Sequence, residues 1–254
     1  DLFVLVAYQK MQARWRQSVV LKPAPSTPVC AYFFKKFFED TALPSQALQV
    51  ISAEIPEIET LVSSSKFKFI SFIGSAKVGW NLRKILAPGT RLSLEHGGTA
   101  PAVVCEDANI ELACQSLIKS SFYHAGQVCI STQMIYVHEH VFSTFVKKFS
   151  DATKNLLVGN ALNEQTDVGP LIRKEEVQRL KKIINEALSE GAKLACGFQI
   201  LGEHEQFLTP TVLLNVSEDS RIMKEEAFGP VVCLQSFSNE ERVMEKISLQ
   251  DFEF

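Results

Sequence analysis

The sequence lacks the features that mark several classes of protein. Its six cysteines include no Cys-x-x-Cys pair, which argues against a zinc site and against a disulfide framework in a chain of 254 residues. No apolar run is long enough to cross a bilayer. The formal net charge of -3, with dispersed lysines and arginines, gives no basic surface for nucleic acid. We therefore expect a cytoplasmic protein, in a reducing compartment, without a metal, a membrane or a nucleic-acid partner.

Strand and helix patterns alternate along the chain. Strands are predicted at 19–21, 48–51, 66–73, 102–105, 134–137, 193–196 and 210–215, and helices at 29–40, 78–86, 141–157 and 174–189, with another beginning near 107–109. This alternation predicts an α/β fold with a mostly parallel sheet. Two glycines at 97–98 interrupt the pattern, so we expect two domains, 1–97 and 98–254.

Cys129 is the first candidate for chemistry. It lies in the segment Ser121-Phe-Tyr-His-Ala-Gly-Gln-Val-Cys-Ile-Ser131, where Gly126 permits a turn that lifts the thiol out of an apolar run. A free thiol is only a few per cent ionised at pH 7, yet it is already a good nucleophile. Backbone N–H groups around such a loop would lower the pKa of the thiol and offer an oxyanion site.

Three other segments add to this cysteine. Leu94-Glu-His-Gly-Gly98 lies upstream of it, and Lys224-Glu-Glu-Ala-Phe-Gly-Pro230 lies downstream. Phe72-Ile-Gly-Ser-Ala-Lys-Val-Gly79 predicts a strand, a turn and a helix, whose first N–H groups suit a diphosphate. A Gly-x-Gly-x-x-Gly fingerprint is absent from the sequence.

In motif and in spacing, these segments resemble the NAD(P)-dependent aldehyde dehydrogenase family over about residues 19–238. The resemblance implies a partial Rossmann-like cofactor-binding domain at 1–97, followed by an α/β catalytic domain at 98–254. It also implies a small aldehyde as substrate, NAD or NADP as cofactor, and a full-length parent that is a homo-oligomer.

The resemblance gives a role to each motif residue. Cys129 would attack the aldehyde to form a thiohemiacetal, which loses hydride to the nicotinamide and becomes a thioester. Glu95 would activate the water that hydrolyses the thioester, and burial would raise its pKa and suit it to act as a base. The implied cofactor-binding residues are Lys22, Gly74, Ser75, Gly79, His96, Glu226 and Phe228.

Lys22 would hold the adenosine ribose, while Glu226 and Phe228 would bind the nicotinamide ribose and line the pocket of the ring. Glu225 is the adjacent alternative, but the interval of 97 residues from Cys129 favours Glu226.

Two positions depart from the family pattern. His96 stands where the family usually has Leu, which makes the surroundings of the nicotinamide more polar. Pro25 stands where many NAD-preferring members have a Glu that binds the ribose 2′-hydroxyl. Without that carboxylate, NADP is admitted alongside NAD.

Both ends of the chain depart from the family pattern, which suggests a fragment of a longer dehydrogenase. The family's oxyanion-binding Asn would fall at or before the first residue, and no Asn precedes Asn81. Losing such a donor typically costs on the order of a hundred- to a thousandfold in rate. Two alternatives therefore stay open: a catalytically inactive remnant of the family, and a relative that transfers the acyl group to coenzyme A. Glu95 argues against the second, because such members commonly lack that base.

Overall fold

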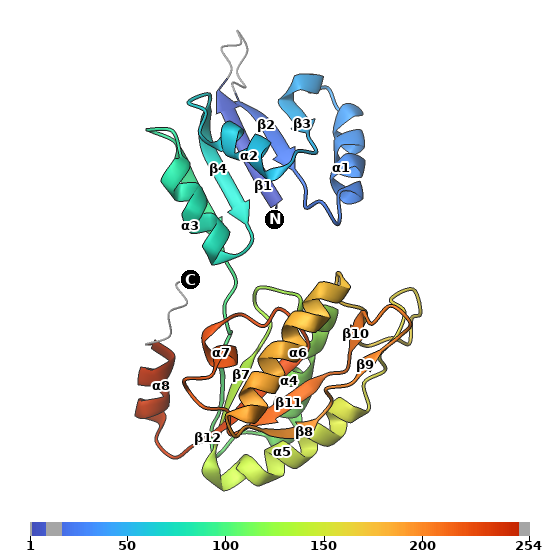
Figure 1. Cartoon of the computed structure of the whole chain (residues 1–254), viewed down its shortest axis with the longest axis vertical. Helices are drawn as coiled ribbons and strands as arrows, with labels where there is room; N and C mark the ends of the chain where they lie inside the picture. Colours follow the sequence, from blue (N-terminus) through green and yellow to red (C-terminus); the bar gives the residue numbers. More distant parts are fainter. Residues whose placement is uncertain (1, 9–16, 249–254) are drawn as a thin grey trace. The chain divides into compact units, whose positions relative to one another are not determined.

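The computed structural model describes residues 2–8 and 17–248, which divide into two compact units, 1–97 and 98–254 (Figure 1). Each unit contains one five-stranded sheet with helices packed against it. The predicted α/β class is confirmed, although both sheets are mixed rather than wholly parallel.

The sheet of the first unit has the strand order β3-β2-β1-β4-β5. Strand β1 runs antiparallel to both of its neighbours, β2 and β4, whereas β2 pairs with β3 and β4 with β5 in parallel. The sequence patterns did not predict β1. The strands are β1 (Leu2–Tyr8), β2 (Gln17–Lys22), β3 (Leu48–Val50), β4 (Phe67–Ile73) and β5 (Arg91–Glu95).

Three helices belong to this unit, α1 (Val29–Glu39), α2 (Ile55–Val62) and α3 (Ala76–Ile85). Helix α2 was not predicted, because Pro56 and three polar residues break up its apolar pattern. It nevertheless begins with a capping box between Glu54 and Glu57, in which each side chain bonds the other residue's backbone N–H. The core of the unit consists of Ile58, Val62, Phe67, Ile70, Phe72 and Leu82.

The sheet of the second unit has the order β6-β7-β12-β11-β8, parallel except for β8 at one edge. Its strands are β6 (Ala102–Val104), β7 (Met134–His138), β8 (Lys193–Cys196), β11 (Thr211–Leu214) and β12 (Val231–Phe237), and a separate hairpin joins β9 (Ile200–Leu201) to β10 (Phe207–Leu208). The helices are α4 (Ile110–Phe122), α5 (Glu139–Lys154), α6 (Lys174–Ser189), α7 (Arg221–Lys224) and α8 (Glu240–Ser248).

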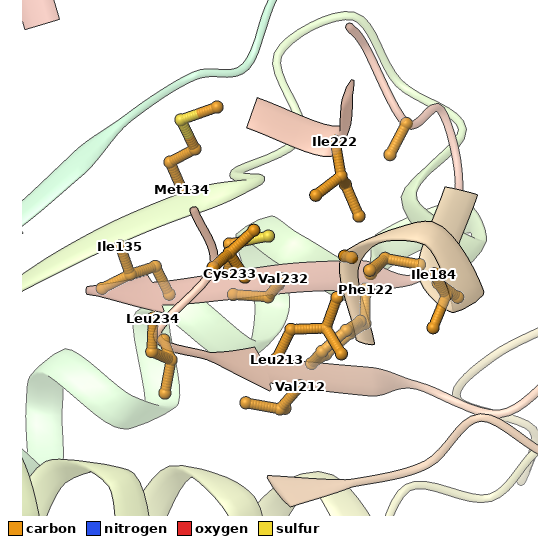
Figure 2. Close-up of a cluster of buried hydrophobic side chains, with 14 of the residues drawn as sticks. Phe122, Met134, Ile135, Ile184, Val212, Leu213, Ile222, Val232, Cys233 and Leu234 are labelled. Atoms are coloured by element: carbon orange, nitrogen blue, oxygen red, sulfur yellow. The ribbon is translucent and has the colours of Figure 1, made fainter. Parts of the chain in front are cut away.

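The core of this unit is built around the central strands β7 and β12 (Figure 2). Val232, Cys233 and Leu234 of β12 are fully buried, and side chains such as Phe122 of α4 and Ile184 of α6 pack into the same cluster. The predicted limits of α6 are confirmed, since its buried positions repeat at helical spacing. Among the helices of the described ranges, none combines the length and the apolarity needed to cross a membrane.

Candidate functional site

Cys129 lies in a turn after α4 and is exposed, as predicted. The turn is closed by a hydrogen bond from the N–H of Ser131 to the carbonyl of Val128 at 2.9 Å. Just before it, His124 and Ala125 adopt left-handed backbone conformations, with φ of 50° and 56°. Such conformations cost non-glycine residues about 1–2 kcal/mol each, so the surrounding structure must enforce this bend.

Gly126 continues the left-handed bend, with φ of 68°, and packs directly against the backbone of Gly229. A Cβ atom at Gly126 would lie only 2.1 Å from the carbonyl oxygen of Gly229. A Cβ atom at Gly229 would in turn lie 2.3 Å from Cδ1 of Leu180 in α6. The two glycines therefore allow the thiol turn, the segment 224–230 and α6 to pack closely together.

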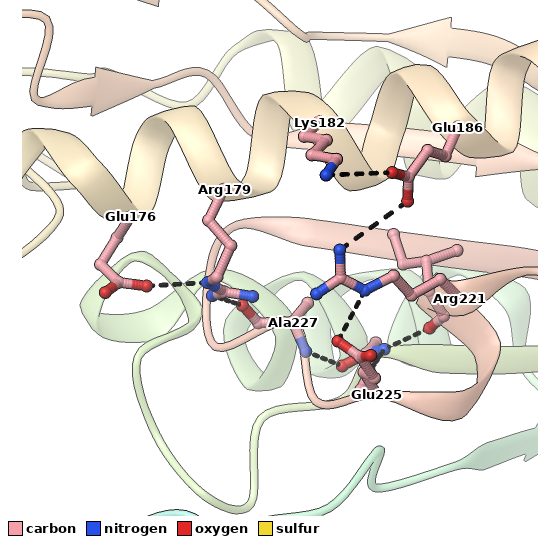
Figure 3. A network of polar contacts seen from close by, with 9 residues as sticks. Glu176, Arg179, Lys182, Glu186, Arg221, Glu225 and Ala227 are labelled. Atoms are coloured by element: carbon pink, nitrogen blue, oxygen red, sulfur yellow. Dashed lines mark hydrogen bonds and ion pairs between the residues drawn. The ribbon is translucent and has the colours of Figure 1, made fainter.

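The segment that bears Glu226 is held in place by polar contacts from several elements (Figure 3). Arg179 of α6 donates to the carbonyl of Ala227 at 2.5 Å and to Glu176 at 2.8 Å. On the exposed side of the segment, Arg221 also donates to Glu225 at 2.9 Å, but an ion pair this exposed adds little to the hold. The amide of Gln133, next to β7, also bonds this segment.

Glu226 itself is only partly exposed, and its Oε1 atom is buried without a hydrogen-bond partner among the described residues. Burial raises the pKa of this carboxyl to about 7, against the opposing effect of Arg179. A buried carboxylate oxygen with no partner is suited to accept a hydrogen bond from a ligand hydroxyl, such as that of a ribose. The residue therefore fits the cofactor role that the motif predicts for it.

A small cavity joins this carboxylate to the surroundings of the thiol. It is lined by Gly98, Gly126, Val128, Ser131, Thr132, Gln133, Glu226, Phe228, Gly229 and Val231. Within the second unit, the fold thus brings together Glu226, Phe228 and the neighbours of Cys129 on either side of the thiol.

In the first unit, the predicted strand, turn and helix are β4, Gly74-Ser75 and α3. Ser75 is the N-cap residue of α3, but its side chain makes no capping hydrogen bond among the described residues. The N–H of Gly74 donates to the carbonyl of Glu95 at 3.3 Å and ties the turn to the end of β5. The first N–H groups of α3 remain oriented for an anion.

Lys22 ends strand β2 and is 6% exposed. Burial lowers the pKa of its ammonium group, and the nearby Glu54 carboxylate opposes that shift. A buried lysine at the carboxyl end of a strand is compatible with the predicted contact to a ribose.

Glu95 differs from expectation. Its burial was predicted from its place between an apolar strand and two glycines, yet the residue is exposed and accepts a hydrogen bond from Ser93 Oγ at 3.1 Å. The side chain is the last of strand β5 and points to the exposed face of that strand, as the alternation of strand side chains requires.

His96, which follows Glu95, packs within the first unit. Its Nε2 atom is buried without a hydrogen-bond partner in the described ranges, next to Gly79 of α3. Its ring meets the edge of Trp80 at a centroid distance of 5.8 Å. Gly79 and His96, both predicted cofactor residues, are therefore in direct contact.

A group of potential metal ligands lies elsewhere, at the carboxyl ends of β6 and β7. The ligand atoms of Glu106, His138 and His140 all lie within 4.8 Å of one another. Glu106 and His140 form an exposed ion pair at 2.8 Å, which raises the pKa of His140 and lowers that of Glu106. This pairing accounts for the cluster without a metal ion.

Two residues of the site were not predicted. Gln133 and Arg179 act through hydrogen bonds to backbone atoms more than 45 positions away in the sequence. The only local signal for Gln133 was a single amide at the start of an otherwise apolar strand.

Comparison with known proteins identifies the chain. Residues 15–251 match the model of the aldehyde dehydrogenase family. The chain belongs to the aldehyde dehydrogenase family. Among curated relatives, the 3-sulfolactaldehyde dehydrogenase of Priestia aryabhattai is 39% identical over 236 residues, which cover 92% of this chain and 49% of that protein. The mitochondrial succinate-semialdehyde dehydrogenase of Oryza sativa is 37% identical, over 88% of this chain and 43% of that protein.

Solved structures of aldehyde dehydrogenases share the fold. An NADP-dependent enzyme of E. coli gives a TM-score of 0.88 at 31% identity, over 92% of this chain and 49% of that one. The glyceraldehyde-3-phosphate dehydrogenase GapN of Methanocaldococcus jannaschii, complexed with NADP, gives 0.83 at 35% identity, over 89% and 49%. The chain thus spans about half the length of the relatives it matches.

Proposed function

We propose that the protein oxidises an aldehyde to a carboxylic acid with NAD or NADP, through a thioester on Cys129. The observation that carries the proposal is the exposed thiol turn packed, through Gly126 and Gly229, against the segment bearing Glu226. The names of the relatives, which are dehydrogenases of 3-sulfolactaldehyde and succinate semialdehyde, support an aldehyde as the substrate.

Four residues would hold the cofactor in this proposal. Lys22 would bind the adenosine ribose, Ser75 and the first N–H groups of α3 the diphosphate, and Glu226 the nicotinamide ribose, beside Phe228. Within the described ranges, Oε1 of Glu226 has no hydrogen-bond partner and the N-terminus of α3 has no side-chain cap, and both facts support these assignments. When bound, the nicotinamide would accept a hydride from the substrate carbon.

The chain's own residues would perform the remaining steps. The thiolate of Cys129 forms a C–S bond to the aldehyde carbon, and the carbonyl oxygen takes the negative charge. Loss of hydride from that carbon restores the C=O bond and leaves a thioester. Glu95 then removes a proton from water, the hydroxide adds to the thioester carbon, and the C–S bond breaks to give the acid and the thiolate again, while Glu95 releases its proton to solvent. The exposure of Glu95 supports contact with water.

The cofactor and the compartment complete the proposal. Pro25 places no carboxylate at its own position to repel a 2′-phosphate, so both NAD and NADP are expected to bind. All six cysteines, which lie within the described ranges, are free thiols. This supports a reducing compartment, for which we propose the cytoplasm.

The test is aldehyde-dependent formation of NADH or NADPH by the purified protein, followed at 340 nm with a panel of small aldehydes. We expect Cys129→Ser to abolish the reaction and Cys30→Ser, which removes the other exposed cysteine, to leave it unchanged. Activity of Cys129→Ser near that of the wild type would overturn the proposal.

A further inference from the structure

Gln133 has an unusual set of hydrogen bonds for a residue outside the predicted motifs. It is 4% exposed, and its amide nitrogen donates to the carbonyl of Ile222 at 2.7 Å and to that of Glu225 at 2.9 Å. Its amide oxygen accepts from the N–H of Ala227 at 2.7 Å. The amide nitrogen and the amide oxygen of this side chain are thus both bonded to the backbone of residues 222–227.

The backbone of Gln133 is fixed as well. Its N–H donates to the carbonyl of Thr99 at 3.0 Å, and its carbonyl accepts from the N–H of Cys233 in β12 at 2.8 Å. The side chain therefore projects from a rigid position at the start of the central sheet, and the segment it binds has little freedom to move.

The bonds from Gln133 bracket Glu226. They join the residues on both sides of it, Glu225 and Ala227, and leave the buried Oε1 atom of the carboxylate without a partner in the part of the chain that the structure describes. A short segment fixed on both sides of one residue sets the direction of that residue's side chain. The arrangement presents a carboxylate at a defined place in the small cavity, ready for a ligand hydroxyl.

We propose that Gln133 is the positioning residue of the site for the nicotinamide half of the cofactor. It holds the backbone around Glu226 in the conformation that binds the ribose, and so it sets the affinity for that half of the molecule alone. The inference rests on the proposed function, since it takes NAD or NADP as the ligand of Glu226.

The chain offers a matched control in the same segment. Arg221 donates to Glu225 from the solvent side, and both side chains are more than a third exposed. Exposed ion pairs contribute little, so Arg221→Gln should leave the segment in place. Gln133→Asn keeps an amide in the core but shortens its reach by one methylene group, which makes it a milder change than complete removal.

The experiment compares the binding of NADPH and NADH with that of ADP, which lacks the nicotinamide and its ribose, by calorimetry on the wild type, Gln133→Asn and Arg221→Gln. We expect Gln133→Asn to weaken the binding of the reduced cofactors about tenfold or more, a free-energy change of about 1.4 kcal/mol. ADP binding should stay within about twofold of the wild type, and Arg221→Gln should match the wild type for all three ligands.

A double-mutant cycle separates positioning from general damage. In a Glu226→Ala background, Gln133→Asn should cause no further loss of NADPH affinity, because the carboxylate that it positions is gone. The positioning role would be refuted if Gln133→Asn weakened the binding of ADP as much as that of NADPH. It would also be refuted if the substitution weakened NADPH binding by the same factor in the Glu226→Ala background. Unchanged NADPH binding in Gln133→Asn would refute it too. If the wild-type chain binds neither reduced cofactor, the proposed function fails, and the inference fails with it.

Discussion

Gly79 in helix α3 and His96 after strand β5 share one small volume: a Cβ atom on Gly79 would lie 2.2 Å from Nε2 of His96. A glycine inside a helix costs about 1 kcal/mol relative to alanine, so its presence needs a reason. The reason here is space for the imidazole, which the strand places against the first turns of the helix.

We expect Gly79→Ala to destabilise the protein by about 1–3 kcal/mol, because the added methyl group overpacks a filled site. In a His96→Ala background the cost should become much smaller, because the main clash is gone, only Leu94 Cδ2 at 3.0 Å stays close, and alanine favours the helix. Thermal unfolding of the four variants measures this coupling. Additive effects of the two substitutions would show that the ring does not occupy the space beside Gly79.

Gly126→Ala should lower the free energy of unfolding more than replacement of another glycine with positive φ does. Gly191 is the matched control, because its φ of 105° is also positive but none of the described residues lies within 4 Å of where its Cβ would be. We expect Gly191→Ala to cost about 1 kcal/mol from backbone strain and Gly126→Ala to cost about 1–3 kcal/mol more, since its Cβ meets the Gly229 backbone. Urea unfolding of both variants gives the difference, and equal costs would contradict the close contact.

Thiol labelling should follow burial. Cys129 and Cys30 are exposed, whereas Cys114, Cys196 and Cys233 are buried. Burial raises the pKa of Cys114 to about 11 and that of Cys233 to about 12, which lowers their thiolate fraction further. Brief iodoacetamide treatment of the folded protein, followed by peptide mass analysis, should modify the two exposed cysteines first. Early modification of Cys233 would be inconsistent with the core of the second unit.

The pKa of Glu226 makes stability depend on pH. Because this pKa is about 7 in the folded chain, above its ordinary value of 4.5, the folded state binds the extra proton between those values. Stability should therefore fall as the pH rises from about 4.5 to 7 and then level off, with a total effect of at most about 3 kcal/mol. Glu226→Gln should remove this dependence, so that it exceeds the wild type in stability at pH 8 and approaches it near pH 4.5. Unfolding curves at several pH values test the sign.

Glu95→Gln should separate the two halves of the proposed reaction. Without a carboxylate to take the proton from water, the acylated form of Cys129 should accumulate and be visible as an added mass on the intact protein. Gln keeps the shape of the side chain and can still interact with Ser93. Steady turnover at the wild-type rate would assign the base to another residue.

The spacing of apolar residues was enough to predict the helices that bury one face and expose the other. Helix α6 begins and ends at the predicted residues, and Asn109 caps α4 by accepting from the N–H of Leu112 at 3.1 Å. Strand β12 was missed although it lies at the centre of its sheet. The run after Gly229-Pro230 is short and apolar, without the alternation of apolar and polar residues that marks a half-buried strand. The sequence therefore cannot tell a fully buried strand from another buried segment here.

The site was predictable to the extent that its chemistry resides in short motifs. Cys129 and Glu226 were proposed from the sequence because the segments that contain them resemble motifs of the aldehyde dehydrogenase family. Gln133 could not, because its importance lies in bonds to carbonyl and N–H groups about 90 residues away. The exposure of Glu95 was mistaken for burial because flanking glycines and leucines do not reveal which face of the strand a side chain occupies.

The contact between Gly126 and Gly229 is made by main-chain atoms alone, with no side chain to yield between them. A displacement of the segment 224–230 is therefore transmitted to the bend before Cys129 rather than absorbed. Under the proposed function, the backbone that carries the ribose-binding carboxylate and the backbone that carries the thiol would therefore behave as one rigid piece.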